Sequence, residues 1–364
     1  MTTPPIRVVV LFGGRSAEHD VSRSTAAHVV AAMDPARYEI TLVGIDRDGR
    51  WLLAEEAMAA LAADRDTLPE RLAVAGPHVE PALVLAPRSA VAPLRPVVVV
   101  PLLHGPFGED GTVQGLLELA NVPYVGAGVL SSALAMDKAK AKEVFAHAGL
   151  AQARWLTFRA DEIPADLTVV IADQLGFPCF VKPANLGSSV GVSRVEGPAD
   201  LARAIALALS YDEWIVLEEA ITGREIELSV LGNFDPRASV PGEVIPGADF
   251  YDYEDKYLDD RAKLLIPAPL PAAITAEFQR LAVVAYRAIR AEGMARVDFF
   301  YEETGPARGP ILNEVNTIPG FTPVSMFPKL WAASGLPYTE LIDELIRLAL
   351  ERHDRRTRRQ RSTR

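Results

Sequence analysis

The sequence is poor in cysteine, in positive charge and in long apolar runs, and each shortage argues against a class of protein. Its 364 residues contain one cysteine, Cys179, so no internal disulfide can form and a reducing compartment is favoured. The apolar run Val8 to Phe12 is too short for a signal peptide or a membrane span. The formal net charge of -11 argues against general affinity for nucleic acid or anionic membranes. We therefore expect a soluble, cytoplasmic protein with no nucleic-acid or membrane partner.

A chain of this length with 49% hydrophobic residues exceeds one ordinary core, and its pattern divides it into three folded parts. In residues 1–125, short apolar runs alternate with four-residue helical spacing, which predicts βαβ units and a parallel sheet covered by helices. Residues 126–222 open with a helix from about 131 to 147 and continue as an α+β block. Residues 223–351 contain a helix, an antiparallel hairpin and a closing helix.

The last stretch, residues 352–364, differs in composition from everything before it. It holds seven arginines, one acid and no apolar residue. Such a run is usually solvated and frayed, and an arm for RNA or membrane binding is the less common reading. We expect a basic disordered tail.

The predicted hairpin carries the side chains of a magnesium-phosphate site. Arg296 and Asp298 alternate along one strand, and Glu314 and Asn316 along the next, so each pair faces one side. Two carboxylates and an amide oxygen suit Mg2+, which completes its coordination with water and nucleotide phosphates. A hairpin with an ordinary wet polar face explains the same pattern about equally well.

A lysine at a strand end precedes a loop of small residues. Lys182 ends one apolar run, and Gly187, Ser188, Ser189 and Gly191 lead into the next. Glycine and serine allow backbone N–H groups to close over phosphate oxygens, and a lysine adds a point charge. The functional interpretation is a phosphate-binding flap, although a glycine-rich turn is the commoner origin of such a loop.

Other residues of the middle part suit the remainder of a nucleotide. Lys138 lies on the helix that enters this part, where it either reaches a phosphate or faces solvent. Glu218, Ile221 and Glu225 follow a strand at a hinge, where backbone amides could read an adenine edge and a carboxylate could accept ribose hydroxyls. Ordinary exposed acids explain these positions nearly as well.

Two loops of the first part suit a small substrate. Gly13 and Gly14 follow the first strand, but Arg15 and Glu18 stand where a dinucleotide motif requires glycine. Glu18 at a helix start is either a surface acid stabilised by the helix dipole or an anchor for a substrate ammonium group. His104 follows the carboxyl end of an apolar strand, which is where open parallel sheets bind ligands.

In this order, the motifs closely resemble those of the D-alanine:D-alanine ligases of the ATP-grasp superfamily. The similarity runs from Val8 to about residue 350. Its most specific marks are Gly13-Gly14 with Glu18, His104-Gly105 with Gly108-Glu109-Asp110-Gly111, Met136-Asp137-Lys138, Lys182-Pro183 with Gly187-Ser188-Ser189-Val190-Gly191, Tyr251-Asp252-Tyr253 with Lys256-Tyr257, and Asn316-Thr317 with Pro319-Gly320.

The resemblance implies an α/β protein of three-domain ATP-grasp architecture, with ATP between the central and C-terminal domains. It implies that two D-alanine molecules are ligated through an acyl phosphate for peptidoglycan precursor synthesis, with release of ADP and phosphate. Two Mg2+ ions, which Mn2+ can replace, and a homodimeric assembly belong to the same expectation.

The resemblance also implies residue roles. Glu18 would pair with the ammonium group of the first D-alanine, and Arg296 with the Gly320 N–H would stabilise an oxyanion. The residues matched to catalysis are Glu18, Ser188, Tyr257, Arg296 and Gly320. Those matched to the two substrates are His104 and Ser325. Those matched to ATP are Lys138, Lys182, Ser189, Glu218, Ile221, Glu225 and Lys256. The metal ligands are Asp298, Glu314 and Asn316.

Two positions bear on the alternatives. Relatives that use D-lactate depart from the Lys256-Tyr257 pattern, so the dipeptide product is favoured over a D-alanine:D-lactate depsipeptide. Glu219 stands where many relatives carry lysine, which puts a minor nucleotide contact in doubt. A non-catalytic nucleotide-binding protein is the more distant alternative, and the arginine tail has no counterpart in the family pattern.

Overall fold

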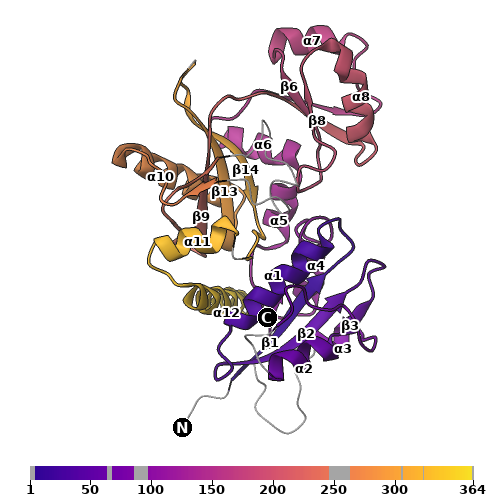
Figure 1. Cartoon of the computed structure of the whole chain (residues 1–364), viewed down its shortest axis with the longest axis vertical. Helices are drawn as coiled ribbons and strands as arrows, with labels where there is room; N and C mark the ends of the chain where they lie inside the picture. The colour runs from indigo at the N-terminus through magenta and orange to yellow at the C-terminus, as the bar shows by residue number, and fades with distance from the viewer. Residues whose placement is uncertain are drawn as a thin grey trace.

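The structure, a computed structural model, describes residues 5–63, 68–85, 97–245, 263–304, 306–322 and 324–362. The tyrosine-rich loop, with Lys256 and Tyr257, lies outside these residues. Three sheets divide the described chain, and Figure 1 shows the part around β6, β8, α7 and α8 as a lobe set apart from the rest.

The first part is built on a four-stranded sheet in the order β3-β2-β1-β4. The apolar run at Val8 becomes β1, which pairs in parallel with β2 and β4 and is buried on both faces. The short edge strand β3 is antiparallel to β2. The predicted βαβ units and parallel sheet are confirmed. The elements are β1 (Ile6–Gly13), α1 (His19–Ala32), β2 (Tyr38–Ile45), β3 (Trp51–Leu53), α2 (Glu55–Ala63), α3 (Pro81–Leu85), β4 (Val97–Pro101) and α4 (Thr112–Leu119).

The predicted helix from about 131 to 147 is two helices, α5 (Val129–Met136) and α6 (Lys138–His147). Asp137 interrupts them in an extended conformation, and its side chain accepts a hydrogen bond from the Lys140 N–H at 3.0 Å. Aspartate is a strong N-cap, so it starts a new helix here instead of continuing the old one. The prediction of one continuous helix was therefore wrong, and the break places Lys138 in the first turn of α6.

The lobe is an antiparallel sheet in the order β5-β8-β6-β7 with its own apolar core. Cys179 lies in that core and is fully buried. The strands predicted around residues 180, 193 and 216 are confirmed. The elements are β5 (Trp155–Arg159), α7 (Leu167–Gln174), β6 (Cys179–Pro183), β7 (Ser193–Val195), α8 (Pro198–Leu209) and β8 (Trp214–Glu219).

The last part holds a larger antiparallel sheet, in the order β12-β11-β9-β13-β14 with β10 beside β9. The predicted hairpin is confirmed: Arg296 pairs with Asn316 and Asp298 with Glu314. The elements are β9 (Arg224–Gly232), β10 (Arg237–Ala238), β11 (Gly242–Ile245), β12 (Lys263–Leu265), α10 (Ala272–Ala288), β13 (Gly293–Glu302), β14 (Gly309–Asn316), α11 (Met326–Ala333) and α12 (Tyr338–Ser362).

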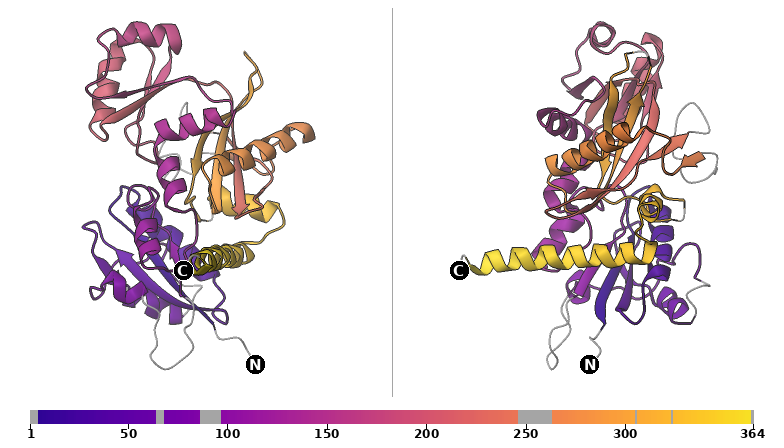
Figure 2. Two further views of the ribbon diagram at one scale, coloured as in Figure 1. Left: turned by 180° about the vertical axis from the view of Figure 1, so that it is seen from behind. Right: turned by 90° about the vertical axis from the view of Figure 1, so that its left-hand side faces the viewer.

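The disordered tail predicted for residues 352–364 is contradicted by α12, which stays helical as far as Ser362. Arg352 is only 3% exposed, because its guanidinium donates to the carbonyls of Tyr124 and Gly126 and lies 4.3 Å from the centroid of the Tyr124 ring. Arg355 and Arg356 pair with Glu292. A run of arginines does not reveal these distant acceptors, so the sequence alone suggested solvent. Figure 2 shows that only the terminal turns project from the molecule.

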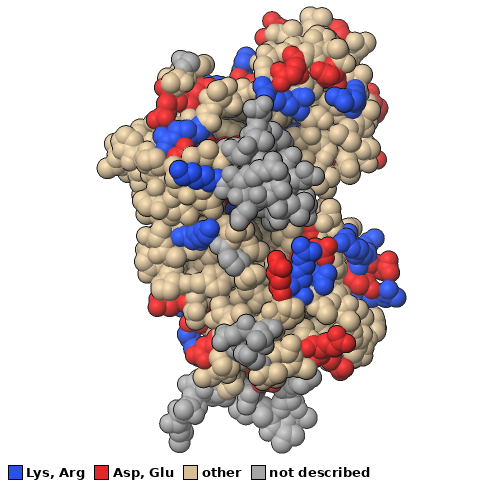
Figure 3. Space-filling view, viewed as in Figure 1, with Lys and Arg blue, Asp and Glu red and all other residues tan. Residues whose placement is uncertain are grey.

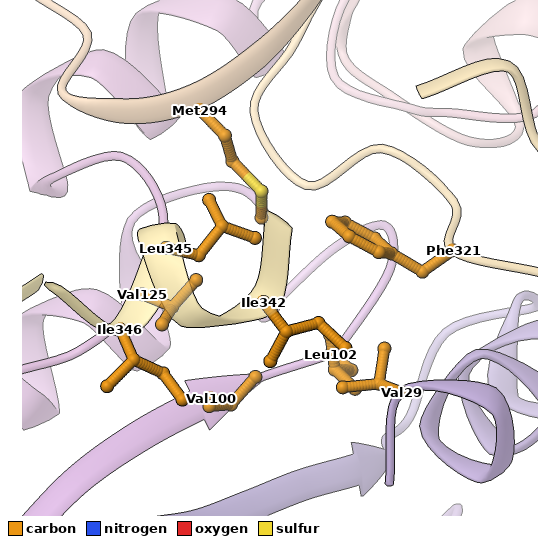
Figure 4. A pocket seen from close by; sticks show the side chains of 9 residues that line it. All are labelled: Val29, Val100, Leu102, Val125, Met294, Phe321, Ile342, Leu345 and Ile346. Atoms are coloured by element: carbon orange, nitrogen blue, oxygen red, sulfur yellow. The ribbon is translucent and has the colours of Figure 1, made fainter. Parts of the chain in front are cut away.

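Helix α12 also shares an apolar core with the first sheet. Ile342, Leu345 and Ile346 of α12 meet Val100 of β4 and Phe321 around a small apolar cavity (Figure 4). The first and last parts are therefore packed into one unit, whereas the lobe keeps a separate core.

The surface gives less information than the interior. On the face drawn in Figure 3, acidic and basic side chains are interspersed. Within the described ranges, no helix is long and apolar enough to cross a membrane.

Candidate active site

Glu18 lies at the start of α1 and is 7% exposed. The Ser188 hydroxyl, on the glycine-serine loop of the lobe, donates a hydrogen bond to its carboxylate. Two glycines make room for this acid: a Cβ on Gly105 would lie 2.7 Å from Glu18 Oε2, and one on Gly187 would lie 3.2 Å away. The first part and the phosphate loop therefore meet at Glu18, although 170 residues separate Glu18 from Ser188.

His104 is buried, and both of its ring nitrogens face protein groups. Its Nδ1 donates to the Ile318 carbonyl at 3.1 Å, because a carbonyl can only accept, and Nε2 faces the Thr25 hydroxyl at 3.2 Å. Burial lowers the pKa of His104, which favours the neutral ring. The two ring nitrogens are thus both engaged by protein groups beside the Glu18 pocket.

Glu109 was not among the predicted site residues, although it stands in the His104-Gly105 motif. Its two carboxyl oxygens accept hydrogen bonds from the Gly105 N–H at 2.8 Å and the Ile318 N–H at 3.2 Å. Ile318 is therefore held through its carbonyl by His104 and through its N–H by Glu109. Both contacts fix the segment that leads to Gly320.

The pH dependence of stability should reveal Glu109. Burial, with a smaller contribution from Glu18, raises its pKa from 4.5 to about 8, so the folded protein keeps a proton that the unfolded chain has released. This stability is complete below pH 4.5 and is lost as the pH rises toward 8. We expect the Tm to fall between about pH 6 and pH 8, and to fall less in Glu109→Gln, which has no proton to release. The exposed variant Glu80→Gln is the control, and a wild-type slope in Glu109→Gln would contradict the assignment.

Three lysines surround one carboxylate at the mouth of the lobe. Lys182 Nζ donates to Glu218 Oε2 at 2.9 Å, and Lys142 Nζ lies 3.4 Å from Glu218 Oε1. Burial opposes ionisation of Glu218, but Lys142 and Lys182 outweigh it and lower its pKa to about 2. Lys138 Nζ donates to the carbonyl of Leu186 in the phosphate loop. One carboxylate among three ammonium groups leaves excess positive charge, which suits a polyphosphate.

Lys142 was not predicted, and its side chain is only 3% exposed. The signal was its spacing, because a residue four positions after Lys138 lies on the same helical face. Burial lowers its pKa.

The hairpin face gathers the opposite charge. Arg296 donates to both oxygens of Asp298, at 2.8 and 2.7 Å, and its Nε lies 3.0 Å from Glu227 Oε2. Asn316 Nδ2 donates to Asp298 at 2.9 Å and lies 3.5 Å from Glu314. Burial opposes the charge on Arg296, but the carboxylates outweigh it and raise its pKa well above its usual value. Glu227 was missed, although it pairs with Asp298 across β9 and β13.

This donor set fits a divalent cation, because several carboxylates share a single guanidinium. Within the described ranges, no three His, Cys, Asp or Glu side chains gather closely enough to hold a metal by themselves. Mg2+ needs few protein ligands when a nucleotide supplies phosphate oxygens. Asp298 and Glu314 would supply anionic oxygens, and a half-turn of the Asn316 amide would present its oxygen.

Gly320 and Ser325 lie side by side before α11. A Cβ on Gly320 would lie 2.8 Å from Ser325 Oγ, so a larger residue does not fit without movement. Ser325 Oγ in turn accepts a hydrogen bond from the Thr322 N–H at 3.0 Å.

The other predicted nucleotide residues occupy the lobe and its connection to β9. Ser188 and Ser189 have left-handed φ values of 49° and 59°, which shape the glycine-serine loop. Ile221 lies between β8 and β9, and Glu225 lies in β9. Lys256 and Tyr257 fall outside the described residues. The individual roles of the site residues stay predictions.

The lobe and the larger antiparallel sheet bring lysines and carboxylates together, and a parallel-sheet domain lies beside them. This arrangement is that of the ATP-grasp class of proteins. The family profile described as the D-ala D-ala ligase N-terminus matches residues 7–127, and the one described as its C-terminus matches residues 144–347. The chain belongs to the D-alanine–D-alanine ligase family.

Relatives and solved structures agree with this membership. The D-alanine–D-alanine ligase of Shouchella clausii is 48% identical over 358 residues, covering 96% of each chain. That of Geobacillus thermodenitrificans is 47% identical over 352 residues, covering 95% of this chain and 96% of the relative. The structure of the Coxiella burnetii D-alanine-D-alanine ligase has a TM-score of 0.84 at 37% identity, covering 99% of this chain and 98% of its own. The VanG D-Ala:D-Ser ligase of Enterococcus faecalis has a TM-score of 0.78 at 34% identity, covering 95% and 99%.

Proposed function

We propose that this protein joins two D-alanine molecules in a reaction that depends on ATP and Mg2+. The products are D-alanyl-D-alanine, ADP and phosphate, and the dipeptide serves cell-wall precursor synthesis in the cytoplasm. One observation carries the proposal: the hydrogen bond between Ser188 and Glu18 brings an acidic, glycine-walled pocket against the loop that Lys138 contacts. An amino acid in that pocket would present its carboxylate to a nucleotide phosphate.

The residues match the chemistry of carboxylate activation. A carboxylate is a poor electrophile, so one of its oxygens must first be converted into a phosphate leaving group. Lys138 and Lys182 would neutralise charge on the transferred phosphate, which is most of what phosphoryl transfer requires. Bound Mg2+ would add charge neutralisation at the same phosphates. Asp298, Glu314 and Asn316 would hold it.

The second step needs an oxyanion site. The amine of the second D-alanine attacks the acyl phosphate, and negative charge develops on the carbonyl oxygen. The Arg296 guanidinium and the Gly320 N–H would stabilise that charge. Ser325, beside Gly320, would hold the carboxylate of the second substrate.

The alternatives are less well supported. A D-lactate-using ligase is not favoured, because the relatives above are named D-alanine–D-alanine ligases. A non-catalytic nucleotide-binding protein would not require the acidic pocket around Glu18. The homodimer is an expectation of the family resemblance, which analytical ultracentrifugation would check.

The decisive experiment is a product assay. Purified protein with ATP, Mg2+ and D-alanine should release ADP, phosphate and the dipeptide in equal amounts, and L-alanine should give none. D-serine and D-lactate offered in competition should be used less well. Failure to consume ATP with D-alanine, or a preference for D-lactate, would overturn the proposal.

A further inference from the structure

Glu219 and Glu218 are neighbours at the end of β8 but face opposite sides of the lobe sheet. Glu218 faces Lys142 and Lys182, whereas Glu219 meets Arg154 and Arg308. Side chains of successive residues on a strand point to opposite faces of the sheet, so these two glutamates must point in opposite directions. The side chain of Glu219 is therefore held away from the three-lysine cluster.

Glu219 is held by two arginines from different parts of the chain. The N–H and Nε of Arg154 donate to its two oxygens at 2.9 and 2.8 Å, and an Arg308 terminal nitrogen donates at 2.6 Å. Burial opposes ionisation, but these hydrogen bonds outweigh it, and the pKa of Glu219 lies below its usual value. The Glu219 side chain is only 7% exposed, so solvent screens these contacts less than those of a surface pair.

Each arginine is also fixed elsewhere. Arg154 caps the end of α7 by donating to the carbonyls of Gln174 and Leu175, at 2.7 and 2.9 Å. Arg308, just before β14, donates to both oxygens of Glu302 at the end of β13, at 2.8 and 3.1 Å. Glu219 thus joins the lobe to the hairpin that carries Asp298 and Glu314.

The contact lies where the chain enters and leaves the lobe. On entry, the Leu312 N–H of β14 donates to the Ala151 carbonyl at 2.8 Å. On exit, Gly223 packs so closely on β13 that a Cβ would lie 2.7 Å from the Tyr301 carbonyl oxygen. Both crossings therefore lie against the hairpin, and Glu219 is the ionic bridge beside them.

We propose that Glu219, Arg154 and Arg308 form an interlobe clamp that positions the lobe over the hairpin and so sets the affinity for the nucleotide. The proposal rests on the proposed function for its ligand. It assigns positioning residues that act through the geometry of the cleft: the clamp holds Lys182 of the lobe at the distance from the hairpin carboxylates that a nucleotide-metal complex requires.

The kinetic test separates positioning from catalysis. In Arg308→Met and Glu219→Gln, the KM for ATP should rise about tenfold, a typical coupling between two parts of a protein. The kcat and the KM for D-alanine should change by less than about twofold, because Arg296, Gly320 and Glu18 are untouched. The effects of the two changes should not add in full in the double variant, because both break the contact between Glu219 and Arg308.

Arg347→Met is the matched control. Arg347 also bridges two glutamates, Glu344 and Glu351, but on the outer face of α12. Its removal should leave the KM for ATP unchanged. A clamp variant whose KM for ATP equals that of Arg347→Met would overturn the proposal.

A distance measurement tests the geometry without relying on turnover. Spin labels on Arg203→Cys in α8 and Ala276→Cys in α10 report the separation of the lobe from the last part, while Cys179 is buried. Without nucleotide, Arg308→Met should broaden the distance distribution, and an unchanged distribution would overturn the clamp. If the protein fails to ligate D-alanine, the proposed function falls, whereas these distances and direct titration with a fluorescent ATP analogue still decide the clamp.

Discussion

Arg296→Met should lower the kcat for dipeptide formation by about a thousandfold or more, the largest effect expected of any single substitution here. Arg296 is the cation on the hairpin face that contacts both Asp298 and Glu227. Methionine keeps the volume of the stem but removes both the proposed donor for the developing oxyanion and the positive charge. The neighbouring carboxylates would then repel one another and the nucleotide phosphates.

Arg296→Lys should recover part of the rate, because lysine restores the charge but not the planar fork that grips both Asp298 oxygens. Arg352→Met is the control for the loss of a buried arginine. It should lower the Tm, because the carbonyls of Tyr124 and Gly126 lose their hydrogen-bond donor, but it should leave kcat close to wild type. Rapid-quench measurement of ADP and dipeptide checks both. A folded Arg296→Met protein with a tenth of the wild-type kcat would contradict the proposed role.

The features that were predictable from the sequence depend on short-range geometry. The hairpin, with Arg296 and Asp298 alternating along one strand and Glu314 and Asn316 along the other, follows from the two-residue period. Its register does not, because a bulge between Asp298 and Phe299 shifts the pairing by one residue. The buried strands β1 and β4 follow from continuous apolar runs. In each case the deciding interactions lie within the segment or between neighbouring strands.

The features that were missed depend on partners far away in the chain. Arg352 is buried by carbonyls more than two hundred residues earlier, so an arginine-rich run that resembles a solvated tail becomes an ordered helix. Lys142 and Glu227 are ordinary polar residues until α6 and β9 are placed beside Glu218 and Asp298. The contact between Ser188 and Glu18 joins segments 170 residues apart, and no local pattern contains it.

Glu18→Gln should raise the KM for D-alanine about a hundredfold or more, because the proposed buried charge partner of the substrate ammonium is lost. Glutamine keeps the size that Gly105 and Gly187 accommodate, and its oxygen can still accept from Ser188. The affinity for ATP alone should stay within about twofold of wild type, since the lysines around Glu218 are untouched. Glu55→Gln, an exposed acid on α2, is the control, and steady-state kinetics with nucleotide titration separates the two effects.

The size of this effect depends on the charge of the whole pocket. Burial raises the pKa of Glu109 to about 8, and the nearby Glu18 and Glu314 add smaller contributions. Near neutral pH, Glu109 therefore holds its proton, so it adds no second negative charge beside Glu18 for the single ammonium group of an amino acid. Glu18→Gln would remove the negative charge that balances the ammonium group and leave this group without a counter-charge. An unchanged KM would instead mean that Glu18 is an acid buried for structural reasons, and that the amino group binds elsewhere.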